Sequence, residues 1–179
     1  MSICPINIEK SESPDFIIRS RDDESAGVEI VKSATRSQKH AESHLEKMPS
    51  GSILELPYYQ DDTTSKETVE EGLRLPCEKL ESSGYGDNGR EIQWSNTIKR
   101  RLEEKYGKLN GEHFRIFQSN QLIILDDAVL LVDFTYSIRR LVESFDPNSY
   151  KIKFDKVCIV SEKFLYDVFG QCGLWDYKF

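Results

Sequence analysis

The sequence predicts an α/β fold in which a mixed central β-sheet is flanked by helices. Two short β-rich segments near the N-terminus surround a polar loop, as in an antiparallel hairpin. A later, highly charged segment carries apolar side chains at helical spacing. Two continuous apolar runs follow in the second half of the chain, and such runs are typical of strands covered on both faces.

The hairpin is predicted at residues 15–19 and 28–32. Both segments are rich in β-branched and aromatic residues, and the polar stretch between them ends in Gly27, as a hairpin loop would. Residues 1–13, which precede the hairpin, are expected to be poorly structured.

A polar, helix-favouring stretch follows at residues 35–48 and is stopped by proline and glycine. Residues 50–90 contain prolines, an acidic and threonine-rich stretch and a glycine-rich turn. We expect them to form an elaborated insertion with a short helix at 65–72, and not a linker between domains. Residues 1–179 should therefore form a single domain.

The second half of the chain carries the clearest helix, at residues 91–109. Its apolar residues recur in steps of four and three and form one stripe: Trp94, Ile98, Leu102, Tyr106 and Leu109. Beyond it we expect buried strands at 121–125 and 154–160, an amphipathic helix at 134–145, and a closing segment at 164–169.

The chain has 179 residues, and no apolar run approaches the ~20 residues that a bilayer span requires. The N-terminus lacks the basic and apolar regions of a signal peptide, so we expect a cytoplasmic protein. Its cysteines show no CxxC spacing and are expected to be reduced and structural. They are Cys4, Cys77, Cys158 and Cys172.

Two acidic residues give the predicted hairpin a chemical interpretation. Asp15 follows Pro14 at the start of the first strand, and Glu29 lies two residues after Gly27 in the second. Carboxylates on adjacent antiparallel strands can converge on a hard cation such as Mg²⁺. Such an ion would polarise a phosphodiester and help to generate hydroxide from bound water, and a nearby lysine would stabilise the charge that develops on phosphorus.

The segments Pro14-Asp15-Phe16-Ile17-Ile18 and Gly27-Val28-Glu29-Ile30 resemble the core hairpin of the PD-(D/E)XK nuclease superfamily. The later course of the chain is similar to uncharacterised bacterial members of that group. The resemblance implies a restriction-endonuclease-like core, metal binding by Asp15 and Glu29, and the backbone carbonyl of Ile30 as a further ligand. It implies Mg²⁺ or Mn²⁺ as cofactor and hydrolysis of DNA or RNA as the activity.

The chain departs from the family pattern at the lysine. The pattern places this lysine two residues after the second acid, where this chain has Val31. Lys32 comes one residue later, and strand alternation would direct it to the opposite face. A β-bulge could redirect Lys32, or the helical residues Lys39 or Gln38 could supply the polar group.

The family is also expected to have a helix before the hairpin, often with another acid. Only Glu9 and Glu12 are available there. His40 and His44 are spaced for one helix face and could bind zinc, but no third ligand is evident and two histidines on a polar helix are solvated in most proteins.

A basic cluster on the predicted 91–109 helix could receive nucleic-acid phosphates. The cluster consists of Lys99, Arg100, Arg101, Lys105 and Lys108. Because Glu103 and Glu104 interrupt it, an ordinary charged outer face is the alternative. The acidic tracts 22–24 and 61–62 are either solvated loops or a docking surface for a basic protein.

Two functions follow from these observations. The first is a metal-dependent nuclease with Asp15 and Glu29 at the metal, Lys32 or Lys39 at the phosphate, and the basic helix along the strand. The second is a catalytically inactive binding protein of the same fold, such as a toxin-neutralising immunity protein or a defence accessory subunit. The missing lysine and the net charge of -7 favour a basic protein partner.

Overall fold

A computed structural model describes residues 6–20, 24–34, 88–126, 133–161, 164–170 and 175–176, together with Ser43 and Lys47. The described strands form one seven-stranded sheet, in which their spatial order is their order in the sequence. The strands are β1 (Asn7–Lys10), β2 (Phe16–Arg19), β3 (Ser25–Lys32), β4 (Ser119–Leu125), β5 (Lys156–Val160), β6 (Phe164–Asp167) and β7 (Trp175–Asp176). The helices are α3 (Gly89–Leu109), α4 (Phe134–Ser144) and the 3-10 turn η3 (Pro147–Ser149).

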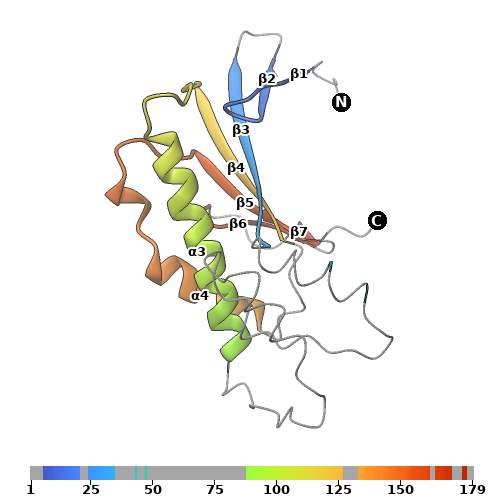
Figure 1. Cartoon of the computed structure of the whole chain (residues 1–179), viewed down its shortest axis with the longest axis vertical. Helices are drawn as coiled ribbons and strands as arrows, with labels where there is room; N and C mark the ends of the chain where they lie inside the picture. The colour runs from blue at the N-terminus through green and yellow to red at the C-terminus, as the bar shows by residue number, and fades with distance from the viewer. Residues whose placement is uncertain are drawn as a thin grey trace.

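The sheet is mixed. Strands β1, β2 and β3 form an antiparallel meander, β3, β4 and β5 run parallel, and β6 and β7 return antiparallel. Helix α3 lies in the crossover from β3 to β4, and α4 lies in the crossover from β4 to β5. The two helices pack together along the same side of the sheet (Figure 1). The predicted α/β class with a mixed sheet is therefore confirmed.

The core lies between this helix pair and the parallel strands. All five residues of the predicted α3 stripe are buried, and they pack in one cluster with Leu122 and Ile124 of β4 and with Val157 and Ile159 of β5. Leu141 of α4 completes this cluster from the neighbouring helix. The helical periodicity therefore identified the face of α3 that contacts the sheet.

Several predicted elements are confirmed within a few residues. The hairpin is β2 and β3, the apolar runs contain β4 and β5, and the two amphipathic segments are α3 and α4. The closing segment contains the strand β6. The predicted helices at 35–48 and 65–72 and the insertion at 50–90 fall outside the described residues, apart from Ser43, Lys47 and residues 88–90, which lead into α3.

The prediction for the N-terminal segment was wrong. Residues 7–10 form β1, which pairs with β2 so that Ile8 lies opposite Ile18. All four residues of this edge strand are exposed. A strand that buries no side chain shows little hydrophobic alternation, which explains why the sequence pattern did not indicate it.

Cys158 lies in β5 as a buried free thiol, as predicted. Burial raises the pKa of this thiol, which keeps it protonated and unreactive at neutral pH. The other three cysteines lie outside the described residues. None of the helices that the structure describes is long and apolar enough to cross a membrane.

Gly27 of β3 occupies a crowded position, and Gly107 of α3 an open one. A Cβ atom at Gly27 would lie 2.7 Å from Cδ2 of Phe117 and 2.8 Å from Cγ of Pro14, whereas a Cβ at Gly107 would meet nothing within 4 Å. We predict that Gly27→Ala lowers the free energy of unfolding by about 1–3 kcal/mol through overpacking. Gly107→Ala should raise it by about 0.5–1 kcal/mol, because alanine restricts the unfolded chain. Urea unfolding of both variants would measure this, and effects of the same sign would contradict it.

Ionisation of the buried Tyr106 side chain should lower the stability of the core at alkaline pH. This side chain is fully buried, and burial raises its pKa from 10.0 to about 12. The neutral phenol therefore contributes stability that is complete below pH 10 and is lost as the pH rises toward 12. We predict that thermal stability falls less steeply between pH 10 and pH 12 in Tyr106→Phe than in the wild type. Parallel melting curves that keep a constant separation over this range would contradict the prediction.

Candidate active site

Glu29 lies in the middle of β3, on the sheet face that α3 and α4 cover. Its partner across the parallel ladder is Leu122, which is fully buried in the core, and paired residues on adjacent strands point to the same face. The exposed fraction of Glu29 is 1%. A carboxylate removed from water to this extent requires charged or hydrogen-bonding partners.

Two lysines of α3 provide these partners. Nζ of Lys105 lies 2.8 Å from Oε1 of Glu29, and Nζ of Lys108 lies 2.6 Å from the same oxygen. The two lysine side chains differ in exposure, at 13% for Lys105 and 40% for Lys108. The second carboxylate oxygen, Oε2, is buried and has no hydrogen-bond partner among the described residues.

Asp15 directly precedes β2, and its carboxylate contacts the residue that follows Glu29 in β3. The β2–β3 register pairs Phe16 with Val28, so its continuation by one residue places Asp15 opposite Glu29. Oδ2 of Asp15 accepts a hydrogen bond of 2.7 Å from the backbone N–H of Ile30. The predicted convergence of the two carboxylates therefore rests on this continued register and on the contact of Asp15 with the amide of Ile30.

Asn110 fixes the end of α3 that carries the two lysines. Its Nδ2 donates to the carbonyl of Tyr106 at 2.8 Å and to that of Ile152 at 2.9 Å. Its Oδ1 accepts from the N–H of Ile152 at 2.8 Å. The two bonds to Ile152 join the end of α3 to the segment before β5, which holds Lys105 and Lys108 over β3.

The lysines at Glu29 differ from those that the sequence motif suggested. Pairing between β3 and β4 is continuous from Ala26 to Lys32, so no bulge redirects Lys32, which is exposed on the opposite face. Lys39, Gln38, His40 and His44 fall outside the described residues. We predicted Lys105 and Lys108 as phosphate contacts, but the sequence did not indicate their contact with Glu29. Their spacing of three residues, which places them on one helix face, was the available signal.

The acids that precede the hairpin lie apart from this contact. Glu9 of β1 is exposed and forms a 3.4 Å ion pair with Arg19. Glu12 is also exposed, in the turn between β1 and β2. In the described part of the chain, the strand β1 directly precedes the hairpin.

The donor types suit Mg²⁺ or Mn²⁺, since both predicted ligands are carboxylates and Oε2 of Glu29 is a buried oxygen that receives no hydrogen bond from the described residues. Within the described ranges, no three His, Cys, Asp or Glu side chains gather to hold a metal ion. Ile30, expected to contribute its carbonyl, contacts Asp15 through its amide. The residues thus fit a cation site with two carboxylates, in which the lysine pair is the main opposing charge.

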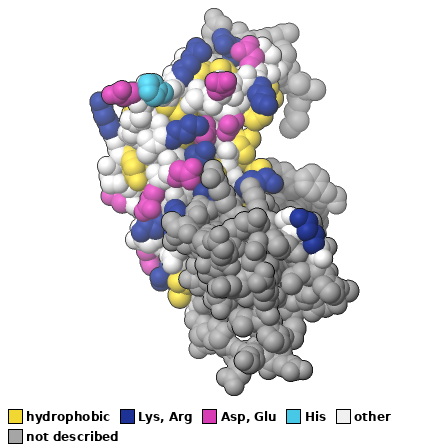
Figure 2. All heavy atoms as spheres, viewed as in Figure 1, with side chains coloured by type: hydrophobic (Ala, Val, Ile, Leu, Met, Phe, Trp, Pro, Cys, Tyr) yellow, Lys and Arg dark blue, Asp and Glu magenta, His cyan; other side chains and the backbone are white. Residues whose placement is uncertain are grey.

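The remaining basic residues of α3 are mostly engaged with acidic neighbours or the backbone. Lys99 lies 3.9 Å from Glu103, and Arg101 pairs with Glu104 at 3.0 Å and donates to the carbonyl of Ala34. Arg100 is exposed. In Figure 2, basic and acidic side chains are interspersed over the described part of the visible face. A continuous basic patch is not present on that part.

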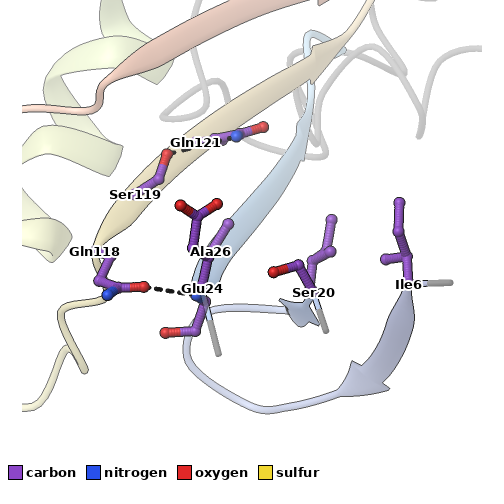
Figure 3. A pocket seen from close by; sticks show the side chains of 9 residues that line it. Ile6, Ser20, Glu24, Ala26, Gln118, Ser119 and Gln121 are labelled. Atoms are coloured by element: carbon purple, nitrogen blue, oxygen red, sulfur yellow. Dashed lines mark hydrogen bonds between the residues drawn. The ribbon is translucent and has the colours of Figure 1, made fainter. Parts of the chain in front are cut away.

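A groove of about 520 Å³ lies on the sheet face opposite Glu29, beside the hairpin loop (Figure 3). Its floor includes Ile18 and Ala26, and Oε1 of Gln118 accepts a hydrogen bond of 2.8 Å from the N–H of Ser25. Of the described residues that line it, Glu24 alone is charged. The groove therefore lacks the cations that a phosphate requires, and the chemistry of the chain is better sought at Glu29.

Two glutamates that pair with cations of α3 should differ strongly in their effect on stability. We predict that Glu29→Gln lowers the free energy of unfolding by about 3 kcal/mol, because it leaves Lys105 poorly compensated in a buried position. Glu104→Gln, which removes an exposed partner of Arg101, should cost less than about 1 kcal/mol. Denaturant unfolding would compare the two, and equal losses would show that Glu29 has no special role in stability.

Comparison of the chain with protein-family models, with curated proteins and with solved structures gives no match. The likeness of the hairpin to the PD-(D/E)XK motif therefore stays a prediction from the sequence. The function has to be argued from the contacts of Asp15, Glu29, Lys105 and Lys108.

Proposed function

We propose that this chain is a metal-dependent, nuclease-like protein of the PD-(D/E)XK type that hydrolyses phosphodiester bonds in DNA or RNA. The observation that carries this proposal is the contact of two helical lysines with a buried acid of the hairpin. Lys105 and Lys108 both bind Glu29, and Asp15, which directly precedes β2, binds the amide of Ile30 beside it. Paired carboxylates and a cation are the groups that hydrolysis of a phosphodiester requires.

The lysine pair of α3 takes the place of the lysine that the strand lacks. Val31 occupies the usual position and packs against the core, and Lys32 points away from Glu29. Lys105 and Lys108 reach the same carboxylate from the helix above the sheet. A lysine on a neighbouring element can stabilise the same charge, because an electrostatic interaction depends on distance and not on the order of residues in the chain.

In this proposal each residue has a distinct role. Asp15 and Glu29 hold Mg²⁺ or Mn²⁺, which when bound polarises the phosphodiester and lowers the pKa of its water. Lys105, the less exposed lysine, orients Glu29. Lys108, at 40% exposure, is close enough to the surface to contact a phosphate oxygen. The arrangement of a β1–β2–β3 meander followed by the parallel strand β4 supports a restriction-endonuclease-like core.

One observation favours a second function. Oε1 of Glu29 already holds two ammonium groups, and Oδ2 of Asp15 already binds the Ile30 amide. Both acids therefore have structural roles that would remain after catalysis was lost. A catalytically inactive binding protein, with a basic protein as the partner of this chain of net charge -7, is the alternative.

Isosteric variants can separate the two functions. We predict that Mn²⁺ or Mg²⁺ stimulates cleavage of single- or double-stranded DNA or RNA by the wild type, and that Asp15→Asn lowers the rate at least about 100-fold. Asparagine retains an oxygen that can accept the Ile30 hydrogen bond, so the fold should persist. Glu103→Gln removes an exposed carboxylate of α3 and serves as the matched control.

The readouts are gel cleavage assays on the four substrate classes and the melting temperature of each variant with and without metal. A ligand that binds the folded state alone raises its stability, so metal binding at the site should raise the melting temperature of the wild type but not of Asp15→Asn. Equal cleavage by both would overturn the nuclease proposal. Absence of both cleavage and metal stabilisation would favour the binding protein.

A further inference from the structure

The cluster at Glu29 has one positive charge more than its carboxylate can balance. Lys105 and Lys108 both bind Oε1, while Oε2 is buried and receives no donor from the residues described. A single carboxylate with two ammonium groups has a formal charge of +1. This surplus lies beside Oε2, the buried oxygen of Glu29 that receives no hydrogen bond from the described residues.

A divalent cation at Oε2 would therefore meet two ammonium groups on the other oxygen of the same carboxylate. Like charges a few ångströms apart repel strongly where water is excluded. Asp15 adds one negative charge nearby, but its Oδ2 is already bound to the Ile30 amide. Metal binding at this site must therefore overcome a repulsion that the chain itself provides.

Lys105 and Lys108 are not equally needed to balance the charge of Glu29. Lys105 is 13% exposed and balances the charge of Glu29 from within the helix–sheet interface. Lys108 is 40% exposed, and its Nζ also lies 5.9 Å from the centre of the Phe114 ring. Lys108 is therefore the surplus cation, since Glu29 remains paired when Lys108 is removed.

We propose that Lys108 is an internal competitor that keeps the affinity of Asp15 and Glu29 for divalent cations low in the free protein. This inference rests on the proposed metal-dependent function. It adds that the lysine nearest the surface opposes metal loading while it is bound to Glu29. Replacement of Lys108 by a neutral side chain should strengthen metal binding, even if it removes a group that phosphodiester cleavage needs.

The test is a Mn²⁺ titration followed by thermal unfolding, which does not depend on activity. Lys108→Met should lower the apparent Kd for Mn²⁺ about tenfold, equivalent to about 1.4 kcal/mol. Lys108→Arg keeps the charge and should bind Mn²⁺ as weakly as the wild type. Lys99→Met, which removes a charge from the same helix about two and a half turns away, is the matched control and should also behave as the wild type.

The outcomes distinguish this inference from the proposed function. If Mn²⁺ stabilises the wild type and Lys108→Met equally, and Asp15→Asn abolishes both effects, the inference is overturned while the metal site stands. Weaker binding by Lys108→Met would also overturn it. If Mn²⁺ stabilises none of these proteins, both proposals fail. Tighter binding by Lys108→Met that persists when Asp15→Asn is added would place the ion elsewhere and overturn the inference.

Discussion

The structure depends on the burial of one charged side chain between the sheet and its longest described helix. Glu29 is a glutamate on a core-facing position of β3, with Leu122 as its neighbour on β4. A lone carboxylate in such a place would destabilise the fold or remain protonated. Lys105 and Lys108 resolve this problem, and in doing so they determine how α3 can lie on the sheet. The rotation and height of the helix are constrained by two ammonium groups that must reach one oxygen.

The same helix placement also serves the hydrophobic core. On α3, Leu102 and Tyr106 are fully buried against the sheet, while Lys105 extends to the edge of this contact. Asn110 then ties the end of the helix to Ile152, in the segment before β5. The hydrophobic contacts, the Asn110 hydrogen bonds and the ion pairs at Glu29 thus all favour the same position of α3. Such consistency between different interactions is what a unique fold requires.

The sequence predicted the elements better than the contact that unites them. Continuous apolar runs and a helical stripe identified β4, β5 and α3, because burial imposes a period on side chains. The exposed edge strand β1 has no such period, and its prediction failed. The meeting of Lys105 with Glu29 spans 76 residues, and no local pattern encodes a contact across that distance. Asp15 and Glu29 could be predicted as a pair because a single hairpin connects the two segments that carry them.

The number of lysines at Glu29 bears on why the cluster exists. Folding requires one cation to compensate a buried carboxylate, and Lys105, the less exposed of the two, meets that need. A second ammonium on the same oxygen adds repulsion from the first, so stability alone does not explain Lys108. An anionic ligand would explain it, because a phosphate near the surface could take up the surplus positive charge. Lys108 is exposed enough to be reached from solvent, whereas Glu29 is not, so a ligand would meet the lysine before the acid. Under the proposed function, this order of access is what a site for a polyanionic chain would need.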